Sequence, residues 1–227
     1  MKKILISIAG LVLLALVAVF VFIATFDPNN YKDRIIAEVR ERTGYSLRLD
    51  GDLEMELYPW FSLSVDDVAI ENPAGFGAEP LVSIEHAAFR ARLLPMLRRN
   101  FEIDSVVLQG VDAGLVTDEN GRSNWAGFTE GSESAPAADA ASSGMPFNDL
   151  RLGGVSIERV NVRYDDRSTG TRATVSEFRF STGELVYGEP IEVDLGFSLS
   201  ANNPELDADV SIVGVVNYDL DNDRYDI

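Results

Sequence analysis

The sequence contains no cysteine and a single histidine. Without cysteine the chain forms no disulfide, supplies no thiolate and carries no lipoprotein-type lipid anchor. The histidine, His86, stands in an alternating strand pattern with no nucleophile motif beside it, so we interpret it as an ordinary strand residue. Thiol and imidazole groups, which are common nucleophiles, bases and transition-metal ligands, are therefore scarce in this chain.

Basic residues are also few, because 19 Lys and Arg residues stand against 37 Asp and Glu residues, for a formal net charge of -18. Binding nucleic acid or an anionic membrane surface requires a cationic surface, so we expect no nucleic-acid partner. We interpret the acidity as a solvated surface that keeps a β-rich body soluble. The 46% hydrophobic content still allows a sizeable apolar interior.

Candidate catalytic groups are weak. Asp66-Asp67 and Asp165-Asp166 are adjacent pairs, and neighbouring strand residues point to opposite faces, so bulge and turn roles fit them better than acid–base catalysis. A series of aspartates, Asp219, Asp221 and Asp223, imitates the start of a calcium loop but lacks the glycine and glutamate that complete it. We predict no catalytic residue, no metal site, no cofactor and no enzyme activity.

One long hydrophobic run opens the chain. Residues 4–26 carry no charge and follow Lys2 and Lys3, and at about 1.5 Å per residue they span a hydrocarbon core of about 30 Å. A cleaved signal peptide has a shorter apolar region and a small-x-small site, which this run lacks. We predict a single transmembrane helix over 4–26, with residues 1–3 as a cytoplasmic tip. The positive-inside rule places the rest in the periplasm of a Gram-negative cell, anchored in the inner membrane.

After this run, residues 27–44 predict a short juxtamembrane amphipathic helix. Asp27-Pro28 supplies an N-cap and a first-turn proline, and Gly44 supplies a stop. The apolar residues between them recur at helical spacing. Such a helix either caps a sheet or rests on the membrane surface.

From Tyr45 onward the apolar period changes to two, which predicts strands. The phase slips at Asp66-Asp67, as a β-bulge would cause. A weak repeat sets residues 101–121 against 150–170, pairing Val106 with Val155, Val111 with Val160 and Gly121 with Gly170. We predict a mainly β fold: an extended, twisted, largely antiparallel sheet forming a groove or an open sandwich. Its β-regions are 45–128 and 146–227, joined by a flexible linker or loop at 129–145.

The alternating strands offer two readings of their apolar positions. They either line an apolar groove for acyl chains or pack the core of a sandwich. Exposing an acyl chain to water costs about 0.8 kcal/mol per methylene, or about 13 kcal/mol for sixteen carbons, so a carrier needs a continuous lining. The groove candidates are Leu47, Leu49, Leu53, Met55, Leu57, Phe61, Leu63, Val65, Ile191, Val193, Leu195, Phe197 and Leu199.

Several landmarks, in a fixed order over about the first 128 residues, resemble the N-terminal region of the AsmA family. After the apolar run come Asp27-Pro28-Asn29-Asn30-Tyr31-Lys32, Thr43-Gly44-Tyr45, Tyr58-Pro59, the stretch 68–77, Leu93-Leu94-Pro95-Met96-Leu97, Val107-Leu108-Gln109-Gly110 and the stretch 118–125. The residues that we expect to be structural in these motifs are Asn72, Pro73, Gly75, Phe76, Gly121, Asn124 and Trp125, with Trp125 as a packing residue.

The resemblance implies an inner-membrane-anchored periplasmic protein, similar to bridge-like lipid-transfer proteins that carry phospholipid toward the outer membrane. The expected function is therefore binding of phospholipid acyl chains along an apolar β-groove, in maintenance of the cell envelope. The alternative is a non-catalytic scaffold or assembly factor that binds outer-membrane proteins through its sheet edges. Family members are usually much longer, so we expect either a fragment or a shortened relative.

Overall fold

A single large β-sheet forms the body of the protein. The computed structural model describes residues 14, 25–57, 60–93, 95, 102–128, 151–186, 189–219 and 224–226. The predicted linker, 129–145, and nearly all of the predicted membrane span, 4–26, lie outside these residues. Among the residues described, no helix has the length and apolar character needed to cross a bilayer.

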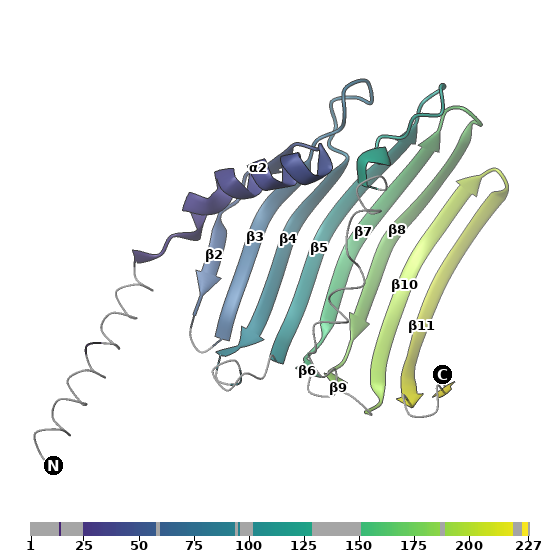
Figure 1. Cartoon of the computed structure of the whole chain (residues 1–227). Coiled ribbons are helices and arrows are strands. Elements are labelled where there is room, and N and C mark those ends of the chain that lie inside the picture. The colour runs from purple at the N-terminus through teal and green to yellow at the C-terminus, as the bar shows by residue number, and fades with distance from the viewer. Residues whose placement is uncertain are drawn as a thin grey trace, which may run out of the picture.

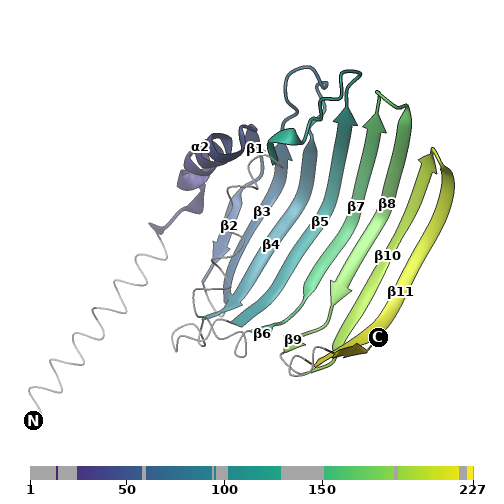
Figure 2. The ribbon, with the colours of Figure 1, turned by 45° about the vertical axis from the view of Figure 1, so that its right-hand side comes forward.

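The sheet is twelve-stranded and open, and its strands lie side by side in one curved layer (Figures 1 and 2). The main path runs β1-β3-β4-β5-β7-β8-β10-β11-β12, with β2 beside β3, the short β6 beside β5, and the short β9 beside β6. Pairing is antiparallel except where β5 meets β6 and β7. The strands are β1 (Leu47–Leu49), β2 (Leu53–Glu56), β3 (Trp60–Ile70), β4 (Val82–Arg92), β5 (Glu102–Thr117), β6 (Arg151–Leu152), β7 (Val155–Asp166), β8 (Thr171–Thr182), β9 (Leu185–Val186), β10 (Ile191–Asn202), β11 (Glu205–Asp219) and β12 (Arg224–Asp226).

The prediction of a mainly β, open sheet is confirmed. Within the described residues all strands belong to connected pairings, so they do not form the two packed sheets of a sandwich. The sheet is mixed because the β5–β7 pair is parallel. In that pair Val106 is the partner of Val155 and Val111 of Val160, so the two copies of the weak sequence repeat lie side by side in register.

The predicted helix after the apolar run is confirmed with shorter bounds. It opens with the 3-10 turn η1 (Pro28–Tyr31), capped by the Asp27 side chain, and continues as α2 (Lys32–Thr43). Gly44 ends it at φ 75, where its N–H donates to the carbonyl of Arg40 at 3.0 Å. No residue of α2 is buried, and the helix lies at the β1–β2 side of the sheet, away from β10 and β11 in both views (Figures 1 and 2).

Four residues on neighbouring strands share a left-handed backbone conformation. They are Asp67 on β3, Gly110 on β5, Arg159 on β7 and Glu177 on β8, with φ between 51 and 64. Such a residue within a strand interrupts the regular alternation, so that side chains beyond it exchange faces. Three of the positions lie on one line across the sheet, because the register places Asp67 opposite Glu85 on β4, Glu85 opposite Gly110, and Gly110 opposite Arg159. Glu177 lies close to this line, beside Asn161 of β7, where the β7–β8 register shifts.

The phase slip predicted at Asp66-Asp67 is present, but it comes from the left-handed residue Asp67 and not from a bulge. The pairs Asp66–His86 and Val68–Ile84 flank it without any register shift between β3 and β4. The reason is that the apolar pattern of β4 changes phase at the same level, at Glu85. Each strand from β3 to β8 therefore keeps its apolar side chains on the same face above and below the line.

Gly110 permits a cross-strand contact at this line. The side chain of Glu85 lies where a Cβ on residue 110 would stand. From there its carboxylate reaches past β5 to Arg159 on β7, with Oε2 2.6 Å from Nη2. Only a residue without a side chain allows this passage, and its φ of 64 also favours glycine.

We expect Gly110→Ala to lower the free energy of unfolding by about 1–3 kcal/mol, because alanine is strained at this φ and displaces Glu85. Denaturant unfolding followed by circular dichroism measures the change. Gly114→Ala on the same strand is the matched control, since its Cβ would meet nothing within 4 Å. Equal effects of the two substitutions would contradict the claim that position 110 specifically requires glycine.

Candidate functional site

One face of the sheet is lined by apolar rows that run across the strands. Residues paired across neighbouring strands point to the same face, so the register gives each row directly. One row consists of Leu53, Val65, Ala87, Leu108, Ile157, Phe180, Leu195 and Ile212. At about 4.8 Å between strands it is about 34 Å long, roughly the thickness of a bilayer core with its two layers of acyl chains.

Two further rows lie parallel to the first. The next consists of Leu49, Val68, Ile84, Val111, Val160, Phe178, Phe197 and Val210, in which the Phe178 and Phe197 rings are 6.3 Å apart. The third consists of Leu47, Ile70, Val82, Ala113, Val162, Val175, Leu199 and Ala208. Strand β10 alternates regularly through Leu195, Phe197 and Leu199, so all three rows share one face, which we call the apolar face.

The apolar face is largely uncovered by the described residues. The hydrophobic side chains that are buried are Tyr45, Leu53, Ala69, Leu81 and Val111, and only two of these belong to the three rows. Leu63 is 38% exposed and Ile212 is 50% exposed, although both point to the apolar face. A packed core would leave such residues nearly inaccessible, so the described residues do not close this face into a core.

The opposite face is polar. On β3 it carries Ser62, Ser64 and Asp66, and on β10 it carries Asp194 and Ser198. Ion pairs join its strands, including His86 Nδ1 to Asp66 Oδ1 at 2.6 Å and Arg179 Nε to Asp194 Oδ1 at 3.6 Å. His86 is thus a strand residue with an acidic neighbour, as its sequence context predicts.

The predicted groove residues within strands all lie on the apolar face. They come from β1, β2, β3 and β10, which form two separate parts of the sheet: Leu47, Leu49, Leu53, Met55, Phe61, Leu63, Val65, Ile191, Val193, Leu195, Phe197 and Leu199. Leu57 lies just beyond β2 and is half-buried. Whether these residues bind lipid stays a prediction. Sequence reasoning missed the middle of the face, on β4 to β8, because the phase change breaks the alternation there.

Asn124, one of the family-motif residues, closes one end of the sheet. Its side chain is 0% exposed and fills the place beside β5 that β4 leaves empty. Oδ1 accepts from the N–H of Val116 at 2.8 Å, and Nδ2 donates to Gly114 O at 2.8 Å and to Asn72 Oδ1 at 2.7 Å. Asn72 in turn donates to the carbonyl of Glu79 at 2.9 Å. The two asparagines thus connect the turn before β4 with the end of β5.

The segment after Asn124 packs on Tyr45, just past the end of α2, and on the apolar face. The Tyr45 hydroxyl donates to Asn124 O at 2.8 Å and accepts from the N–H of Gly127 at 3.1 Å, and its ring stacks on Phe128 at 4.3 Å. Trp125 lies 5.9 Å from Tyr164, a residue of the apolar face, so it covers that end of the face as a packing residue.

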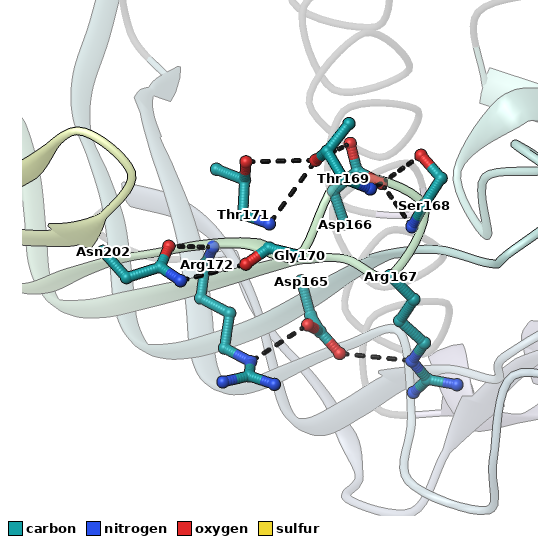
Figure 3. A network of polar contacts seen from close by, with 9 residues as sticks. All are labelled: Asp165, Asp166, Arg167, Ser168, Thr169, Gly170, Thr171, Arg172 and Asn202. Carbon is teal, nitrogen blue, oxygen red and sulfur yellow. Dashed lines mark hydrogen bonds and ion pairs between the residues drawn. The ribbon is translucent and has the colours of Figure 1, made fainter.

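The other motif residues are found in turns. Gly75 and Gly121 have φ of 100 and 79, and the Phe76 N–H donates to the carbonyl of Pro73 at 3.3 Å. Asp165 and Asp166 are the last two residues of β7 and adjoin the β7–β8 turn, slightly before the predicted turn position (Figure 3). Asp165 accepts from Arg167 at 3.2 Å and from Arg172 at 3.3 Å.

Asp166 organises the β7–β8 turn. Its carboxylate accepts hydrogen bonds from the hydroxyls of Ser168 and Thr169, which lower its pKa from the ordinary value of 3.8 (Figure 3). Asn202 connects this turn to the next hairpin, accepting from Arg172 N at 2.6 Å and donating to Gly170 O at 2.9 Å. The group is a hydrogen-bonded network that fixes the two hairpin ends relative to each other.

No group of three or more potential metal ligands occurs in the part of the chain that the structure describes. Of the calcium-like series, Asp221 and Asp223 lie outside those residues, as does the Asp219 side chain.

The lowered pKa of Asp166 predicts a pH-dependent contribution to stability. The folded state favours the ionised form, so the contribution is present above the unfolded pKa and is lost as pH falls through the lower folded pKa. We expect Asp166→Ala to destabilise the protein at pH 7, and the difference from wild type to shrink below about pH 4. Thermal unfolding at several pH values measures it. Exposed Asp207→Ala is the control, and a difference that grows in acid would contradict the prediction.

Comparison with known proteins adds three matches. A family model described as the AsmA family matches residues 1–207. The chain is 26% identical over 110 residues to Protein AsmA of Escherichia coli (strain K12), covering 48% of this chain and 18% of that protein. It is 24% identical over 177 residues to AsmA family protein YhjG of the same organism, covering 73% of this chain and 25% of that protein. The matched parts are thus a quarter or less of these relatives.

Proposed function

Because this chain belongs to the AsmA family, we propose that it is a carrier that shelters lipid acyl chains on the apolar face of its sheet. The observation that carries the proposal is the set of unbroken apolar rows, which cross the sheet from β1 and β2 to β11 while their side chains stay partly exposed. The activity requires binding alone and no covalent step.

The energetics favour a lining of this kind. Transfer of an acyl chain out of a bilayer costs about 0.8 kcal/mol per methylene exposed to water, so any polar gap along the path adds a barrier. The three rows have no polar member. Alternate residues of a strand are about 7 Å apart, so the three rows together are wide enough for more than one acyl chain. A two-chain phospholipid is therefore the ligand that we propose.

We further propose that the protein is anchored in the bacterial inner membrane by residues 4–26, with its N-terminus in the cytoplasm and the sheet in the periplasm. The support is the uncharged run itself and the lysine pair before it. With the family resemblance, this placement supports movement of phospholipid toward the outer membrane and a role in envelope maintenance.

A second candidate function is that of a scaffold for outer-membrane proteins. Strand β12 pairs only with Asn217–Asp219, so in the described part of the chain the outer edge of β11 from Glu205 to Val216 has no strand partner. An open edge is a template for strand addition. A β-barrel client cross-linked to β11, with no lipid retained by the protein, would favour this alternative.

The lipid-carrier proposal predicts that Leu63→Asp removes bound lipid. A charge on a lipid-facing strand position costs about 2–4 kcal/mol, so retained phospholipid should fall by about 30-fold or more. Mass spectrometry of lipids in the purified protein measures it. Leu63 is already 38% exposed, so the substitution leaves folding largely intact.

Ser64→Asp is the matched control, because Ser64 adjoins Leu63 but points to the polar face. It should retain lipid at the wild-type level. A lipid-free wild-type protein that is folded, or equal retention by both variants, would refute acyl-chain binding at this face.

The membrane placement predicts the accessibility of an introduced thiol. The chain has no cysteine, so Asp207→Cys creates a unique label site on the exposed β11 edge. A membrane-impermeant maleimide should modify it in intact spheroplasts, with cytoplasmic thiol proteins left unlabelled as the control. Labelling only after lysis would place the body in the cytoplasm instead.

A further inference from the structure

The segment between the apolar run and α2 is fastened to the first edge of the sheet by one side chain. Asn29 Nδ2 donates to the carbonyl of Leu53 at 3.1 Å, and the Leu53 N–H donates to Asn29 Oδ1 at 2.9 Å. A side-chain amide with both bonds to one residue of β2 reproduces a rung of an antiparallel ladder. We call this pair of bonds the edge clamp.

Other contacts fix the orientation of the clamp. Asp27 Oδ1 accepts from the Asn29 N–H at 2.9 Å and from Nδ2 at 3.0 Å, which sets the amide plane. Lys32 Nζ lies 3.2 Å from Asp52 Oδ1, one residue before Leu53, and the Lys32 side chain is only 19% exposed. The clamp is therefore a defined attachment between residues 27–32 and β2.

Its position relates the apolar run to the apolar face. Asp27 follows Phe26, the last residue of the predicted membrane span. Leu53, which the clamp holds, is buried and is the first member of the row that continues through Val65 and Ala87. The shortest connection between the bilayer and the start of a row thus passes through Asn29.

We propose that Asn29 is a positioning residue that holds the β1–β2 end of the apolar rows at the bilayer surface, so that acyl chains enter the rows from the membrane in which the protein is anchored. This inference rests on the proposed function. The clamp touches no lipid and acts by fixing the orientation of the sheet relative to its anchor. Its loss leaves the rows intact but lowers the frequency with which they meet the bilayer, as a loosened tether lowers an effective concentration.

The test uses the full chain in phospholipid vesicles and a phospholipid with a photoreactive diazirine in its acyl chain. In one arm this lipid is part of the same bilayer, and in the other a short-chain, water-soluble analogue is added in solution. Cross-links to peptides of the sheet are quantified over time by mass spectrometry. Asn29→Ala should slow cross-linking from the bilayer about tenfold and leave cross-linking of the soluble analogue unchanged.

Asn30→Ala is the control, since Asn30 is an exposed neighbour of the same type that takes no part in the clamp. It should resemble wild type in both arms. Asn29→Asp keeps the acceptor for the Leu53 N–H but sets a carboxylate oxygen against Asp27 Oδ1 and the Leu53 carbonyl. It should therefore slow cross-linking from the bilayer at least as much as Asn29→Ala, and it serves if Asn29→Ala folds poorly.

Three outcomes would overturn the inference. If Asn29→Ala lowers both arms together, the residue only stabilises the sheet. If it lowers neither, the clamp does not set entry. If wild type cross-links to the sheet in neither arm, acyl-chain binding itself fails, and this result is distinguishable because it requires no variant.

Discussion

The change of side-chain phase along one line across the sheet is the constraint on which the apolar face depends. A strand alternates faces with a period of two, so a phase change in one strand alone would turn half of its apolar residues toward the polar side. Left-handed residues at Asp67, Gly110 and Arg159 make the change at one level, and the apolar pattern of β4 changes there too. On β8 the change comes at Glu177, where the register with β7 shifts, and each row stays continuous across that shift.

The stability of this body comes mainly from its hydrogen-bonded ladders and from one closed end. Few hydrophobic side chains are buried among the described residues, and several of these, with buried Asn124, lie around the junction of Tyr45, Leu81 and the turn after β5. The two lateral edges differ. Asn29 and α2 cover the β1–β2 edge, whereas β11 exposes Ile212, Val213 and Val215. A sheet with one closed edge, one open edge and one apolar face suits a protein that receives an apolar ligand.

Function and fold are linked through the uncovered face. A single β-layer with one largely apolar side is unfavourable in water unless a ligand, a membrane or another layer covers it. The opposite face carries charged and hydroxyl side chains that interact with water, in keeping with the strongly acidic composition. The proposed activity needs no catalytic group, because an apolar face shelters acyl chains from water by contact alone.

Local patterns in the sequence determined much of this protein. The helix stop at Gly44, the phase change at Asp66-Asp67, the strand character after Tyr45 and the family motifs all follow from short-range rules of capping, alternation and turn chemistry. The repeat at 101–121 and 150–170 even contained the register of the parallel β5–β7 pair. Only the tertiary structure decided that the middle strands join the apolar face, that Asn124 replaces a missing strand, and that Asn29 holds β2. These depend on residues brought together across the sheet, and pairing between distant segments leaves no periodic signal in the chain.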